Sequence, residues 1–198
     1  IGFFHARNSD GDFEELRSES AWGNEYAEGN ARQYLWLVPH TPENLFETLG
    51  GKDESLKRLD EMFAEMVKEI EDGHEIAVPE IWYWHGNEPG LHIPYLFALA
   101  GEYKKTTYWV EWLMFHRYKN AADGLAGNDD GGTLSAWYIF SSLGMYPLAG
   151  TERYVFGKPI FDRIEFQNEA APQWIQRKKD DIDYQIMIND QNWPKPDI

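Results

Sequence analysis

The chain has 198 residues, of which 42% are hydrophobic and 16% are aromatic, and this is enough for a globular domain with a sizeable core. Its formal net charge of −16 argues against a protein that binds nucleic acid or anionic membranes, since both need clustered Lys and Arg. The absence of cysteine excludes disulfides and thiolate metal sites. No apolar run is long enough to cross a bilayer, and no signal peptide opens the chain.

The first part of the chain predicts two helices after an irregular segment. Residues 1–33 show no sustained hydrophobic period and are expected to form functional loops. A helix is predicted over residues 41–49, with the Thr41 hydroxyl as its cap and a pair of glycines at its end. A longer amphipathic helix is predicted over residues 53–73. Its apolar face is formed by Leu56, Leu59, Phe63, Met66 and Ile70.

The second part predicts further helices and then strands. Segments 79–92 and 121–132 are rich in Gly or Pro and are expected to be loops. The helices are predicted over residues 94–101, 105–119 and 133–143, and the last of them is apolar nearly all round and should be buried. Residues 154–166 then show a strand–turn–strand pattern. Because short connections make consecutive helices antiparallel, loops at one end are expected to gather into a shared site.

The first of three chemically unusual loops contains Glu28, in the stretch Tyr26-Ala27-Glu28-Gly29-Asn30. A carboxyl group beside a glycine and among aromatic rings can have its pKa raised enough to act as a general acid. The competing interpretation is an ordinary surface glutamate next to a turn.

The second loop is His85-Gly86-Asn87-Glu88-Pro89, followed by His92. Asn87 and Glu88 supply oxygen atoms, which hard cations such as Ca²⁺ require, although the spacing is not that of an EF-hand. Histidine is a poor calcium ligand, so His85 and His92 fit better as partners of a substrate hydroxyl or as supports for a ligand. The competing interpretation is a polar loop that caps the next helix.

The third loop is Gly127-Asn128-Asp129-Asp130-Gly131-Gly132, directly before a predicted helix. Two adjacent acids in a glycine-rich loop can serve as a general base or bind a metal. The competing interpretation is a solvated turn in which an Asp or Thr133 caps the helix.

Together and in this order, these stretches resemble the catalytic domain of glycoside hydrolase family 92. The motifs are YAEGN with QYLWLVPH, HGNEP with H and PYLF, and DGLAGNDDGG with SAWYIFSSLGMYP. The opening GFFHARNSDGDFEE and the later YVFGKPIFD are also similar to family segments, so the resemblance runs from about residue 2 to residue 166. It implies an exo-acting, calcium-dependent α-mannosidase that inverts the anomeric configuration.

The resemblance also implies roles for the acids. Glu28 matches the family's general acid and Asp130 best matches its general base, with Asp129 as a helper or the competing assignment. Inverting glycosidases hold two such carboxyl groups about 6.5–9.5 Å apart, which leaves room for the attacking water.

The resemblance further implies a calcium site and a sugar site. Asn87 and Glu88 match the segment that helps to hold Ca²⁺, which in the family engages the 2- and 3-hydroxyls of mannose. The candidates for substrate contacts are His85, His92, Asn30 and Trp36. Arg32 stands where relatives often have Trp, and this predicts an altered leaving-group subsite.

The implied fold is mostly α: part of an (α/α)6 barrel, with C-terminal β-strands that belong to an adjoining sheet. We expect the partial barrel over residues 1–147 and a β-rich segment over residues 148–198. The predicted helices are fewer than half of those in a full barrel, so we expect a piece of a longer enzyme whose remaining part is its partner.

The implied substrate is a mannose-containing oligosaccharide or glycoprotein glycan of the N-glycan type, with α-1,2 or related linkages. We expect no nucleic-acid or membrane partner and a secreted or periplasmic location. The alternative function is a non-catalytic, calcium-dependent mannoside-binding or structural module.

Overall fold

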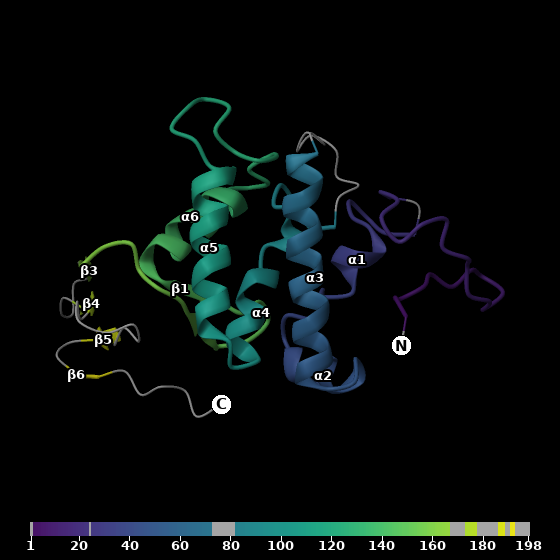
Figure 1. The fold of residues 1–198 in the computed structure, drawn as a ribbon, viewed down its shortest axis with the longest axis horizontal. Coiled ribbons are helices and arrows are strands. Elements are labelled where there is room, and N and C mark those ends of the chain that lie inside the picture. The colour runs from purple at the N-terminus through teal and green to yellow at the C-terminus, as the bar shows by residue number, and fades with distance from the viewer. Residues whose placement is uncertain are drawn as a thin grey trace.

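The computed structural model of this chain describes residues 2–23, 25–72, 82–166, 173–177, 186–188 and 191–192. Within them the fold is mostly helical, with strands toward the C-terminus (Figure 1). The helices are α1 (Ala31–Tyr34), α2 (Pro42–Thr48), α3 (Lys52–Glu71), the 3-10 helix η1 (Glu88–Gly90), α4 (Ile93–Leu99), α5 (Tyr103–Arg117) and α6 (Thr133–Leu143). The strands are β1 (Met145–Pro147), β2 (Tyr154–Phe156), β3 (Arg163–Phe166), β4 (Gln173–Arg177), β5 (Ile186–Ile188) and β6 (Gln191–Asn192). None of the described helices combines the length and the apolar character that a membrane span needs.

The two helices predicted in the first part of the chain are confirmed as α2 and α3. α3 is amphipathic, and it buries Leu59, Met62, Phe63 and Met66. Thr41 does occupy the position before α2, but its side chain makes no capping hydrogen bond, so the predicted hydroxyl cap is wrong. The Thr41 carbonyl instead accepts from the amides of Asn44 and Leu45, and Pro42 supplies a backbone angle suited to the first turn.

The core lies where α3, α4 and α5 meet. All seven residues of α4 are buried, and α4 lies between the two longer helices (Figure 1). The ring of Phe63 on α3 has its centroid 5.7 Å from that of Phe97 on α4 and 4.6 Å from that of Trp109 on α5. Each fully buried side chain of this size contributes about 1.5–3 kcal/mol, so this junction fixes the three helices and hence the loops at their ends.

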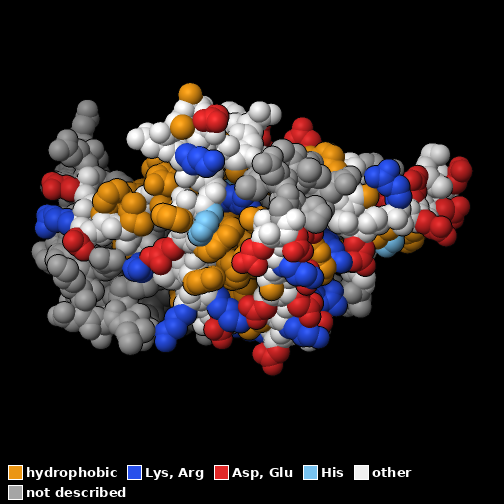
Figure 2. All heavy atoms as spheres, turned by 45° about the horizontal axis from the view of Figure 1, so that its top comes forward, with side chains coloured by type: hydrophobic (Ala, Val, Ile, Leu, Met, Phe, Trp, Pro, Cys, Tyr) orange, Lys and Arg blue, Asp and Glu red, His pale blue; other side chains and the backbone are white. Residues whose placement is uncertain are grey.

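The predicted helix over residues 133–143 is confirmed as α6, but the prediction of a buried helix holds for one face only. Leu134 and Trp137 are buried, whereas Tyr138 and Ile139 are 37% and 57% exposed. Apolar side chains are visible between charged ones on the face shown in Figure 2. The reason is that α5 and β1 pack against α6 and leave its other face uncovered in this chain.

Strands form as predicted at β2 and β3, but they do not pair with each other. β2 pairs antiparallel with β1, with Tyr146 opposite Val155, while β3 begins the antiparallel sheet β3-β4-β5-β6. Gly144, with a left-handed φ of 72°, ends α6 and turns the chain into β1, and the turn at residues 148–153 then brings β2 beside it. The domain boundary at 147/148, which lies between the paired β1 and β2, stays a prediction, as does the barrel itself. The predicted loop residues 79–81 lie outside the described residues.

Candidate active site

The three unusual loops lie against one another. The Asn87 side-chain amide donates to the Glu28 carbonyl over 2.6 Å, which joins the first loop to the second. The second and third loops touch through two glycines, since a Cβ on Gly127 would collide with the carbonyl oxygen of Gly86. The second loop therefore contacts both the first and the third, which confirms that these loops gather together, while a shared site formed by them stays a prediction.

Glu28 and Asp130 share an unusual backbone conformation. Their φ angles are 51° and 46°, and among the described residues other than glycine they alone have positive φ. This left-handed region costs an L-amino acid about 1–2 kcal/mol, and such strain persists chiefly where function requires the side chain to be held in place. Two residues that lie in different loops thus share a backbone conformation that is often found at functional sites.

The side chain of Glu28 is exposed, and its aromatic neighbour is the ring of Tyr34. The neighbouring Gly29 is buried against the ring of Tyr34, whose hydroxyl donates to the carbonyl of Ala27. Burial raises the pKa of Tyr34, and the charge of Glu28 raises it further. The acid of the first loop is therefore close to a phenol that stays protonated, in an arrangement open to a ligand.

The two adjacent acids of the third loop differ in their surroundings. Asp129 accepts from the Ser135 amide over 2.8 Å and from the Ser135 hydroxyl over 2.9 Å, so both of its oxygens are used at the start of α6. Asp130 is held through its backbone, whose carbonyl accepts from the Thr133 hydroxyl over 2.7 Å. Within the part of the chain that the structure describes, the Asp130 carboxylate makes no hydrogen bond or ion pair. Asp130 is the acid of this pair with oxygens available for a ligand.

His85 and His92 are both part of the packed interior, with exposed fractions of 1% and 4%. The His85 ring bonds to the hydroxyls of Tyr83 and Tyr118 at 2.7 and 2.9 Å, and His92 Nε2 donates to the carbonyl of Trp36 over 2.5 Å. Burial lowers the pKa of His85 to about 3, with Arg117 contributing, and lowers that of His92 to about 4. Both rings are neutral at pH 7 and support the loops; a contact with sugar stays a prediction.

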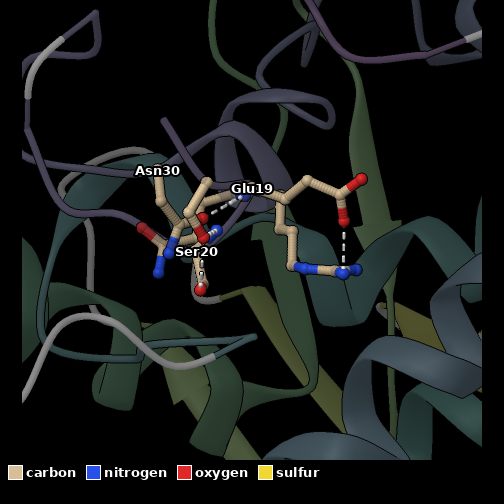
Figure 3. A network of polar contacts seen from close by, with 6 residues as sticks. Glu19, Ser20 and Asn30 are labelled. Carbon is tan, nitrogen blue, oxygen red and sulfur yellow. Dashed lines mark hydrogen bonds and ion pairs between the residues drawn. The ribbon is translucent and has the colours of Figure 1, made fainter. Parts of the chain in front are cut away.

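Asn30 and Trp36 lie beneath the first loop. Asn30 is fully buried and caps α1 by accepting from the Gln33 amide over 3.0 Å. It lies beside Ser20, near the ion pair that Glu19 forms with Arg32 (Figure 3). Trp36 is 2% exposed. These contacts give both residues a role in shaping the loop, and substrate contact by either stays a prediction.

A family model decides the classification. The model of the glycosyl hydrolase family 92 catalytic domain matches residues 1–198. The chain belongs to glycoside hydrolase family 92. It is therefore catalytic-domain material of a family of glycosidases.

Solved structures agree with the family assignment. A family GH92 α-mannosidase from Bacteroides thetaiotaomicron is 35% identical with a TM-score of 0.68, over 82% of this chain and 21% of that one. A family GH92 inverting mannosidase from the same organism is 28% identical with a TM-score of 0.78, over 97% of this chain and 28% of that one. The chain thus matches less than a third of the length of either protein.

A curated relative from Arthroderma benhamiae is named as an uncharacterized secreted glycosidase. It is 24% identical to this chain over 136 residues, which is 69% of this chain and 16% of the relative. Here too the chain corresponds to a small part of the relative's length.

The two residues predicted to bind calcium in this family 92 chain have suitable oxygen atoms, but two residues are too few to complete a calcium site. Asn87 Oδ1 accepts from the Glu88 amide over 3.1 Å, which leaves it a further lone pair, and the Glu88 side chain is exposed. Both are hard oxygen donors, whereas Ca²⁺ takes about 6–8 such ligands. Within the described residues, no group of three or more His, Cys, Asp or Glu residues could hold a metal. Asn87 and Glu88 could therefore supply part of a coordination shell.

Sequence reasoning did not single out Tyr83, Tyr118 and Arg117, which surround His85. Tyr118 lies 33 residues from His85, and no local pattern marks their contact. Tyr83 lies only two residues from His85, but the segment consists of bends and turns, so no periodic pattern marks their contact either.

Proposed function

We propose that this chain forms part of the active site of an inverting α-mannosidase that removes mannose from the non-reducing ends of α-mannosides. The observation that carries the proposal is the convergence of three loops that present Glu28 and Asp130, both on strained left-handed backbone. Mannosidase activity in the proteins of similar structure supports the substrate class. Linkages of the α-1,2 type or related ones in N-glycans are the expected targets.

In the proposed reaction Glu28 is the general acid and Asp130 the general base. Glu28 gives its proton to the glycosidic oxygen as the bond from that oxygen to the anomeric carbon breaks. Asp130 takes a proton from the water that attacks the anomeric carbon from the opposite face. The water oxygen thus replaces the leaving oxygen at the anomeric carbon, with inversion. At the end of the step Glu28 has lost one proton and Asp130 has gained one.

Asp129 supports this reaction through position. Its two bonds to Ser135 anchor the third loop to the start of α6, and the strained residue that follows is thereby held. We therefore assign Asp129 as the helper of Asp130.

We propose Asn87 and Glu88 as ligands that contribute to a Ca²⁺ site. When bound, such an ion would supply a positive charge that coordinates and orients sugar hydroxyls. The Asn87 amide meanwhile holds the Glu28 carbonyl, so the same side chain would link the metal site to the general acid. We also propose a secreted or periplasmic location, in line with the name of the curated relative.

The test is release of mannose from α-mannobiose by the full-length protein. Removal of one catalytic carboxyl should lower kcat by about 10²–10⁴-fold, so Glu28→Gln and Asp130→Asn should each be severely impaired. Asp123→Asn is the matched control, because Asp123 is an exposed acid in the same loop as Asp130. Full activity in either catalytic variant would refute its assigned role. NMR of the first-formed anomer should show β-mannose, and α-mannose would contradict inversion.

A chelator tests the metal separately. Activity should fall on chelation, return with Ca²⁺, and return less with Mg²⁺, which demands a smaller octahedral shell. Activity that is insensitive to thorough chelation would refute the calcium requirement.

The second candidate function is a calcium-dependent mannoside-binding module. It is supported by the exposed side chain of Glu88 and the remaining lone pair of Asn87 Oδ1, which could bind Ca²⁺ whether or not a glycosidic bond is then cleaved. Binding of mannobiose without release of mannose would establish this alternative.

A further inference from the structure

A chain of buried and partly buried hydrogen bonds runs from His85 in the second loop to the first turn of α6, directly after the third loop. The Tyr118 hydroxyl donates its single hydrogen to the carbonyl of Leu134 over 3.2 Å. His85 Nε2, 2.9 Å from the same hydroxyl, must therefore carry the hydrogen of that bond. In a neutral ring the other nitrogen, Nδ1, is then an acceptor, and the hydroxyl of Tyr83 donates to it over 2.7 Å. The order is thus fixed from Tyr83 through His85 and Tyr118 to Leu134.

The rings of this hydrogen-bond chain are also fixed by packing. Trp137 on α6 lies parallel to the Tyr118 ring with centroids 5.7 Å apart, and it meets the His85 ring edge-on at 4.3 Å. Its indole N–H donates to the carbonyl of Leu91 over 2.8 Å. Trp137 and His85 are almost fully buried, so the His85 ring has no room to turn, and the partly buried Tyr118 ring is held on one face by Trp137.

The ends of this hydrogen-bond chain adjoin the proposed catalytic parts. His85 precedes Gly86 and Asn87, which contact the third loop and the Glu28 carbonyl. Leu134 follows Thr133, whose hydroxyl donates to the Asp130 carbonyl. We propose that Tyr118 is a positioning residue, which through His85 and Leu134 sets the distance of the Asp130 loop from the loop that holds Glu28. This inference rests on the proposed function and adds a residue to it.

The test is Tyr118→Phe in the full-length protein, which removes the hydroxyl and keeps the ring against Trp137. Misplacing a reacting group by about 1 Å can cost up to about 10²-fold in rate, so we expect kcat to fall about tenfold while KM changes less than about twofold. Tyr108→Phe on α5 is the control, because Tyr108 is 58% exposed, and it should behave as the wild type. An unchanged kcat in Tyr118→Phe, or a change confined to KM, overturns the inference.

A second substrate locates the defect. Fluoride leaves with little help from a general acid, so hydrolysis of α-mannosyl fluoride depends on the base and not on Glu28. Tyr118→Phe should therefore slow α-mannosyl fluoride and α-mannobiose equally, whereas Glu28→Gln should slow only the latter. A loss confined to α-mannobiose in Tyr118→Phe would mean that the hydroxyl acts on the acid side, and it would overturn the inference.

Hydrogen exchange separates this inference from the proposed function. Peptides that cover residues 121–132 should exchange faster in Tyr118→Phe than in the wild type, while peptides from α3 should not change. Equal exchange in residues 121–132 overturns the inference whatever the activity. If the wild type hydrolyses neither substrate, the proposed function fails, and the exchange experiment still decides whether Tyr118 holds the loop.

Discussion

The buried neutral histidines predict a loss of stability in weak acid. An ordinary histidine has a pKa of 6.5, whereas burial lowers those of His85 and His92 to about 3 and about 4 in the folded protein. Between pH 6.5 and these lower values the unfolded state binds more protons than the folded state. Folding stability from these two groups is therefore complete above pH 6.5 and is lost as the pH falls below it.

The size of the effect follows from the shift. For His92 at pH 5, the ratio of proton binding in the unfolded and folded states lowers the free energy of unfolding by about 2 kcal/mol. His85 contributes about the same at this pH, so the two together account for about 4 kcal/mol between pH 7 and pH 5. This is a large part of the stability of an ordinary domain.

The assay is urea unfolding at pH 7 and pH 5, followed by tryptophan fluorescence. In His92→Gln the amide nitrogen can still donate to the Trp36 carbonyl but cannot titrate, so the loss between the two pH values should shrink by about 2 kcal/mol. His116→Gln, which removes an exposed imidazole, should keep the wild-type pH dependence. An equal loss in His92→Gln and the wild type would refute the reasoning.

Three further predictions concern the loops. Glu28→Gly should raise the free energy of unfolding by about 0.5–1 kcal/mol, because glycine tolerates the left-handed φ, while abolishing mannose release; thermal unfolding and a mannose assay check both. Asp129→Ala should cost about 1 kcal/mol in chemical unfolding and lower kcat, since Ser135 on α6 loses both of its hydrogen bonds to the Asp129 carboxylate; unchanged stability would contradict the proposed anchoring of the loop by Asp129. Gly127→Ala should lower kcat without altering any acid, because its Cβ would displace Gly86; wild-type kinetics would show that the two loops need not touch.

The parts of the fold that the sequence predicts correctly depend on local signals. α3 has an apolar stripe at helical spacing, and α2 begins at a proline and ends before two glycines. Burial of α6 was predicted correctly for one face only, because an apolar helix does not specify which of its faces the same chain will cover. The partner of β2 was also missed, since the short strand β1 directly follows α6 and pairs with β2 across the turn at residues 148–153.

The candidate site divides in the same way. The loops around Glu28 and Asp130 could be found from residue types and their order, because glycine, acid and amide residues are concentrated there. The environment of each histidine could not, because burial and the contacts with Tyr118 and Trp36 join residues 33 and 56 positions apart. Tertiary packing, and not the local sequence, buries these two imidazoles, keeps them neutral and joins them to Tyr118 and Trp36.

The arrangement also separates catalysis from loop geometry. Gly127 permits the close approach of two backbones, because a Cβ there would collide with the backbone of Gly86, whereas a Cβ on Gly86 would meet the ring of Trp84. Glu28 and Asp130 instead adopt glycine-like φ angles while carrying carboxylates. Since glycine would satisfy the backbone at both positions with less strain, the turn alone does not account for the acids. The carboxylates are kept although they strain the backbone, and for this reason we propose that these two residues carry the chemistry. We propose a supporting role for Asp129, His85 and Tyr118.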